Sequence, residues 1–430
     1  MRPAKSPLRA LAGWLVALGC AATAACAPAA ANDDEALGAE SAQTQAPDLR
    51  PELAQVNDVS ILFPLAKTRA GFDSYLTPKS AGRNGPLLGQ AIYERAFGAP
   101  GTLQLGGTPA APALAGLKLV AVRFDPCFAE RRVSDEASCK NQMRLVFQTL
   151  SFKSDGTSAA DDAVHVFYEL TREELTGAIK TMIALRTRLA GTRRLGPLGP
   201  HPLLQTPGGD LDVNAAREVQ RLVTSLAGPA NLVQFTQFAP SGLDTTWNFS
   251  GFDVQKNAPM VIPTLPANDD KHVAFFAGFT PGQLEGDPAF VPASTAPRAD
   301  NMQMLGNIMT ARAGGQEARK AAFEALLRIE HPGVHTPDTI DCASCHAVEP
   351  VRSLIGQKHF SGELAAAKGA FEHDPRWVPE TDIAPVRRPD SGVNVHMFSY
   401  KGKVPSVHRR TINESAAIVA HVNDRILTAR

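Results

Sequence analysis

Short runs of apolar residues, bounded by turn residues, recur through the middle of the chain. The run over 117–124 carries Val120, Val122 and Phe124 at alternate positions, which is typical of a strand with one buried face. No regular alternation of strands with helices accompanies these runs, so the pattern predicts an antiparallel sheet rather than a parallel one. The predicted strands cover 59–64, 117–124, 142–150, 164–168, 232–238, 245–252, 260–262 and 272–279.

Apolar residues spaced three or four positions apart predict helices in the intervening and following stretches. Thr171 and Glu174 form a capping-box pattern at the start of a helix that reaches 189. A second such pattern, Thr411 with Glu414, predicts the start of a C-terminal helix. The expected fold class is α+β, with a mixed domain of antiparallel strands followed by a mainly α-helical domain. The other predicted helices cover 87–97, 212–226, 301–313 and 316–330, and the two domains cover 57–295 and 300–430.

The N-terminus has the pattern of an export signal. Basic residues precede an apolar run over 11–25, which is too short to span a bilayer. Cys20 and Cys26 both follow small residues, as the lipidated cysteine of a bacterial lipobox does. We prefer Cys26, because it leaves the longer apolar run, and keep Cys20 as the alternative. A plain cut near 29–31, giving an unanchored protein, is the other interpretation.

Composition limits the partners that the chain is expected to have. Residues 27–56 are rich in alanine, proline and acidic residues, so we expect a flexible tether after a signal peptide over 1–26. Lysine and arginine together number 43, as do aspartate and glutamate, and no basic run suggests nucleic acid. We expect an exported protein, lipid-anchored on the periplasmic side or outer surface of a Gram-negative membrane.

The stretch Cys342-Ala343-Ser344-Cys345-His346 is the attachment signature of c-type haem. Two thiols three positions apart lie on one face of a helical turn, so each can add to one vinyl group of the porphyrin. His346 then falls under the iron as its proximal ligand. A zinc site needs four ligands and the motif supplies three, whereas a thioredoxin-like dithiol would follow a strand. The sequence therefore predicts one covalently bound haem c.

Two further cysteines, Cys127 and Cys139, lie in the connection between two predicted strands. In an oxidising compartment such a pair is expected to form a disulfide. Their spacing lacks the short Cys-x-x-Cys form that tunes a reactive thiol. We therefore predict a structural Cys127–Cys139 bridge.

The segment over 300–430 resembles a class I c-type cytochrome appended to another domain. The resemblance rests on the haem motif, on Met397 as the single methionine downstream of His346, and on the C-terminal helix. It implies that Met397 is the distal iron ligand. His396 is the direct rival and would give a bis-histidine haem of lower potential. One departure is the helix over 316–330, which stops well before Cys342.

Two short stretches, 341–346 and 410–416, also resemble those of uncharacterised secreted lipoproteins of delta-type proteobacteria, a resemblance that names no activity. We interpret the chain as a membrane-tethered monohaem c-type cytochrome that carries single electrons to or from an unidentified redox partner.

Two alternatives stay open. The first is a haem enzyme or sensor whose N-terminal domain binds a ligand or partner, although 57–295 shows no catalytic constellation and its histidines, His165, His201 and His272, are expected to be structural or exposed. The second is a structural lipoprotein in which Cys342 and Cys345 form a disulfide and no haem is bound.

Overall fold

The computed structural model describes residues 52–98, 112–126, 140–240, 246–255, 258–261, 272–276, 300, 314–335, 340, 342–359, 371–383 and 394–428. The described residues all belong to one compact unit, Ala46–Arg430. The predicted signal peptide and nearly all of the predicted tether lie outside them. Within the described part, no helix is long and apolar enough to cross a membrane.

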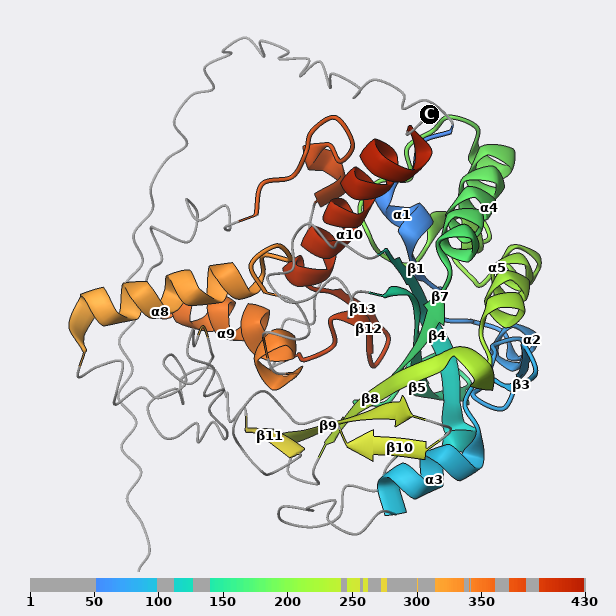
Figure 1. Cartoon of the computed structure of the whole chain (residues 1–430), viewed down its shortest axis with the longest axis horizontal. Helices are drawn as coiled ribbons and strands as arrows, with labels where there is room; N and C mark the ends of the chain where they lie inside the picture. The colour runs from blue at the N-terminus through green and yellow to red at the C-terminus, as the bar shows by residue number, and fades with distance from the viewer. Residues whose placement is uncertain are drawn as a thin grey trace, which may run out of the picture. The chain divides into compact units, whose positions relative to one another are not determined.

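The central feature is an antiparallel sheet, which confirms the predicted mixed α and β class (Figure 1). Its main path runs in the order β1-β4-β5-β7-β8-β9-β10, with β6 paired to β5 and β11 paired to β9. Because successive side chains of a strand point to opposite faces, each strand contributes to both sides of this sheet. The strands are β1 Ser60–Leu62, β4 Leu117–Asp125, β5 Asn141–Lys153, β6 Gly156–Ala159, β7 Ala163–Leu170, β8 Leu232–Pro240, β9 Thr246–Gln255, β10 Ala258–Val261 and β11 His272–Phe276.

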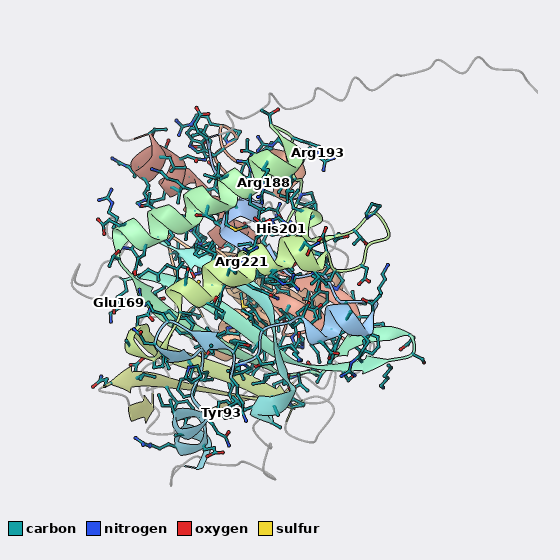
Figure 2. The ribbon with its side chains drawn as sticks, turned by 90° about the vertical axis from the view of Figure 1, so that its right-hand side faces the viewer. Tyr93, Glu169, Arg188, Arg193, His201 and Arg221 are labelled. Carbon is teal, nitrogen blue, oxygen red and sulfur yellow. The ribbon has the colours of Figure 1, made fainter. Side chains whose placement is uncertain are left out.

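One face of the sheet is covered by helices α4 (Arg172–Ala190) and α5 (Val213–Leu226), which lie side by side in Figure 2. The predicted capping box begins α4: the Glu174 backbone N–H donates to Thr171 Oγ1, and the Thr171 N–H donates to the Glu174 carboxylate. Apolar side chains of both helices are buried against the sheet. The shorter helices nearby are α1 Val56–Val59, α2 Arg69–Asp73 and α3 Gln90–Gly98, with a small hairpin of β2 Ala81–Gly82 and β3 Gly85–Pro86.

The C-terminal segment lies over the opposite face of the sheet (Figure 1). It includes a two-stranded hairpin that the sequence patterns did not predict, so this segment is less purely helical than expected. Its elements are α8 Gly315–Ile329, α9 Cys342–His359, β12 Phe398–Lys401, β13 Val404–Val407 and α10 Arg409–His421, followed by a π-helix over Val422–Leu427.

The predicted start of the C-terminal helix is wrong. Helix α10 begins at Arg409 with His408 as its N-cap, so Thr411 and Glu414 lie inside the helix rather than at its end. Thr411 Oγ1 instead donates to the Met397 carbonyl, and Glu414 pairs with Arg123 of β4. The capping-box pattern therefore marked two residues that hold α10 to its neighbours.

Several hydrogen bonds join the C-terminal segment to the sheet. Gln148 Nε2 of β5 donates to the Tyr400 carbonyl at 2.5 Å, and the hydroxyls of Ser60 and Ser415 are 2.7 Å apart. These side chains are buried. The boundary predicted near 295–300 stays a prediction, but the two segments share a packed and hydrogen-bonded contact.

Candidate functional site

A cavity of ≈ 140 Å³ lies between the sheet and the C-terminal segment. The sheet contributes polar as well as apolar side chains from its central strands, including Arg144, His165, Phe167 and Thr236. The C-terminal segment contributes Cys342, Cys345, His346 and Met397. The structure therefore brings together the predicted thiols, the predicted proximal ligand and the predicted distal ligand.

The haem motif opens helix α9, so Cys342 and Cys345 are separated by about one helical turn. Both side chains are partly buried and line the cavity. The structure holds both residues as thiols, without a bond between them. This is the arrangement that two thioether bonds to one planar group require.

The ring of His346 is held in one tautomer by the main chain. Its Nδ1 lies 2.8 Å from the Val395 carbonyl oxygen, which can only accept, so Nδ1 carries the proton. Burial lowers the pKa of His346 to about 4, which keeps the ring neutral at pH 7. The lone pair is then on Nε2, to which no described residue is hydrogen-bonded. This is the tautomer and orientation typical of a metal-ligating histidine.

Three aromatic rings of the sheet surround His346. Phe238 of β8 and Phe249 of β9 each lie 5.3 Å from its ring centroid. His165 of β7 lies 5.6 Å away, with the two imidazole planes tilted by 33°. His165, which the sequence led us to expect as a structural or exposed residue, lines the same cavity as the haem motif.

The two predicted distal ligands differ in their surroundings: Met397 lines the cavity and His396 does not. Met397 lines the cavity, with its Sδ 3.9 Å from Cys345 Sγ. His396 is fully buried, with Nε2 2.7 Å from an Asp161 carboxylate oxygen and Nδ1 2.9 Å from Ser399 Oγ. Both ring nitrogens of His396 therefore already have partners, and the residue does not line the cavity.

The grouping of Ser399, His396 and Asp161 has the residue types of a hydrolytic triad. Ser399 is only 2% exposed and His396 is 0% exposed, so a substrate has no access to them. Although burial opposes its ionisation, the hydrogen bond from His396 holds the pKa of Asp161 below its usual value. These bonds join β12 to the β6–β7 connection, which makes this group a structural tie.

An arginine cluster lies at the sheet side of the cavity. Burial opposes ionisation of Glu414, but Arg123 and Arg410 hold its pKa well below the usual range. Arg410 Nε donates to Glu414 at 2.7 Å, and its other nitrogens donate to the carbonyls of Ile329 and His335. Arg410, the arginine of the resembling C-terminal stretch over 410–416, thus makes all of these bonds within the protein.

Arg144 is less completely paired than the other arginines of the cluster. Its nearest carboxylate oxygen, on Asp125, is 3.5 Å away, and its guanidinium lies 4.7 Å from the centroid of the Phe167 ring. Its Nε is buried without a hydrogen-bond partner, and burial lowers the pKa of Arg144. An unpaired buried donor of this kind suits the carboxylate of a bound cofactor, because guanidinium and carboxylate pair through directed hydrogen bonds.

The signal that could have identified His165 and Arg144 is alternation along the strands. Val164 and Val166 are buried, and His165 between them must face the opposite side. Arg144 of β5 pairs with Phe167 of β7, which brings the two polar positions onto neighbouring strands of one face. Without the strand pairing, each residue looked isolated.

Some predicted residues lie outside the described part of the chain, namely Cys20, Cys26, Cys127 and Cys139. His201 is buried, accepts from the Leu203 N–H and meets the Asn57 carbonyl at 3.2 Å, which confirms its structural role (Figure 2). Among the described residues there is no group of three or more histidine, cysteine, aspartate or glutamate side chains arranged to hold a metal ion by themselves. No family model, curated protein or solved structure matches the chain.

Proposed function

We propose that the chain binds one haem c through thioether bonds to Cys342 and Cys345, with His346 as an axial iron ligand, and that it carries single electrons. The observation that carries this proposal is the state of His346. Its Nδ1–H is fixed on the Val395 carbonyl, and the ring lines a cavity that also receives both thiols of the motif. A bound haem would supply an iron that alternates between the ferrous and ferric states.

The residues around the cavity have separable roles in this proposal. The Val395 carbonyl orients His346 and raises its basicity as a ligand. Phe238 and Phe249 pack on the His346 ring and limit access of water. Arg144 offers its unpaired Nε to a cofactor carboxylate. The cavity of ≈ 140 Å³ is smaller than the about 300–1,000 Å³ that cofactor pockets usually measure, so binding of a porphyrin would need the site to open.

The proposal extends to export and anchoring. A lipid on Cys26, or on Cys20, would hold the protein at a membrane, and a Cys127–Cys139 disulfide would close the β4–β5 connection in the oxidising compartment. Both rest on the sequence patterns. The mass of the mature N-terminal peptide tests the anchor, because a chain that begins near Asn32 without lipid would contradict it.

An enzyme or a sensor differs from a carrier in having an open iron position. A carrier is expected to have six-coordinate iron, since both axial positions are then filled by protein side chains and small ligands are excluded. The residues around the cavity favour the carrier, because two side chains besides His346, Met397 and His165, are able to bind iron and line the same space.

We expect the exported protein, made with haem-maturation machinery, to give a reversible one-electron redox titration. Its ferrous form is expected not to bind carbon monoxide at millimolar concentration within the time of mixing. Ferrous myoglobin, which has a five-coordinate haem, serves as the positive control for carbon monoxide binding. Rapid carbon monoxide binding with peroxide turnover would favour the enzyme or sensor instead, and a colourless protein would favour the structural lipoprotein.

A further inference from the structure

The His165 side chain is placed where it could bind a metal ion. Its side chain lines the cavity, and no described residue is hydrogen-bonded to either of its ring nitrogens. The side chain is half-buried. A neutral imidazole has a lone pair available on one of its two ring nitrogens.

The distance between His165 and His346 matches that of two imidazoles bound to one metal ion. Metal–imidazole bonds of about 2 Å, with about 1 Å from each ligating nitrogen to its ring centre, place the two centroids about 6 Å apart. The observed separation is 5.6 Å, and the planes are tilted by 33°. The observed separation is therefore close to the distance expected for two ligands of one metal ion.

Met397 is held beside the haem motif by contacts of its main chain and of its sulfur. The Val395 carbonyl binds Nδ1, the nitrogen that points away from the metal in this tautomer. Met397 follows two residues later, and its carbonyl is tied to His408 N at 2.9 Å and to Thr411 Oγ1 at 3.1 Å. Its sulfur lies 3.9 Å from Cys345 Sγ, one of the two attachment thiols. His165 reaches the cavity from the sheet, whereas His346 and Met397 both reach it from the C-terminal segment.

We propose that His165 of strand β7 is the second axial ligand of the haem, so that the iron is bound by two histidines, one from the sheet and one from helix α9. This inference rests on the proposed haem attachment. It departs from the class I pattern, in which one domain supplies both axial ligands. Two imidazole ligands are expected to give a lower potential than an imidazole with a thioether.

The test compares two single variants of the exported holoprotein. His165→Ala is expected to keep the covalent haem, because Cys342, Cys345 and His346 are unchanged. It is expected to lose the low-spin ferric spectrum in near-infrared magnetic circular dichroism and electron paramagnetic resonance, and to gain ferrous carbon monoxide binding. Added imidazole is expected to restore the low-spin spectrum. The second variant, Met397→Leu, keeps the size of the side chain and tests the rival ligand; it is expected to retain the low-spin ferric spectrum.

A third variant distinguishes a change of iron ligand from a loss of folding. His165→Met is expected to replace the charge-transfer band of two nitrogen ligands with that of one nitrogen and one sulfur, a change that a structural role for His165 would not produce. If the wild-type band already indicates sulfur and disappears in Met397→Leu, the assignment of His165 is overturned while the haem proposal stands. If the wild-type chain carries no covalent haem, the proposed function fails and this inference fails with it.

Discussion

Replacing Arg186 with alanine is expected to lower the free energy of unfolding by about 3–5 kcal/mol, because it leaves a buried carboxylate without its partner. Arg186 on α4 donates from Nε to both carboxylate oxygens of Asp58, at 3.1 and 2.9 Å, and from a terminal nitrogen to the Leu53 carbonyl at 2.6 Å. The side chains of Arg186 and Asp58 are each 1% exposed. This pair joins α4 to α1, next to the edge strand of the sheet.

The loss in free energy of unfolding caused by Arg186→Ala is expected to be smaller at acid pH. Burial already raises the pKa of Asp58 to about 6, although Arg186 opposes this. Without Arg186, the folded-state pKa lies further above the unfolded value. A raised folded-state pKa means that the folded chain binds the proton more tightly, so the variant gains stability as the pH falls through that pKa.

The matched control for this prediction lies one helical half-turn further along α4. Arg188 pairs with Glu218 of α5, but the two side chains are 57% and 36% exposed (Figure 2). Arg188→Ala is expected to change the free energy of unfolding by less than about 1 kcal/mol. Urea denaturation followed by circular dichroism measures the free energy of unfolding of both variants. Equal losses in the two would contradict the assigned role of the buried pair.

Local patterns predicted those elements whose start is set by neighbouring residues. The α4 helix begins where Thr171 and Glu174 form their reciprocal bonds, and no other part of the chain is needed for that signal. The same pattern at Thr411 and Glu414 gave the wrong helix start, because these side chains bind Met397 and Arg123 instead. A capping-box motif therefore predicts a helix start only where its side chains do not bind residues distant in the sequence.

The residues of the candidate site also fall into those that a local pattern predicted and those that it did not. Cys342, Cys345 and His346 are neighbours in sequence, so the motif alone predicted their common chemistry. His165 and Arg144 reach the cavity only through the pairing of β5 with β7 and through the packing of the C-terminal segment on this face of the sheet. Strand register cannot be predicted from any single run of residues, and for this reason the sequence did not identify His165 and Arg144.

This arrangement gives the N-terminal residues a part in the proposed haem site. The sequence predicted a cytochrome domain over 300–430 preceded by a large domain of unknown role. In the structure, strands β4, β5, β7 and β8 form one wall of the cavity, and the haem motif lies on the other. We infer that the sheet serves as the distal half of the cofactor site.

Changing Cys342 and Cys345 to serine together is expected to abolish covalent haem completely, the largest effect in this account. Serine hydroxyls do not add to the porphyrin vinyl groups under the conditions in which thiols do. Cys345→Ser alone is expected to retain one thioether, and Ser344→Ala, which keeps both thiols and their spacing, is expected to retain two. The single and control variants therefore separate loss of attachment from loss of folding.

The most direct measurement is the pyridine haemochrome spectrum of the denatured, exported chain after acid–acetone extraction. We predict one haem per chain that survives extraction and has the absorption of a haem with two thioether bonds. We predict a spectrum shifted to the red for Cys345→Ser, and no haem for the double variant. Extraction of all haem from the unaltered chain, or a mature chain with the mass of the polypeptide alone, would contradict the central claim.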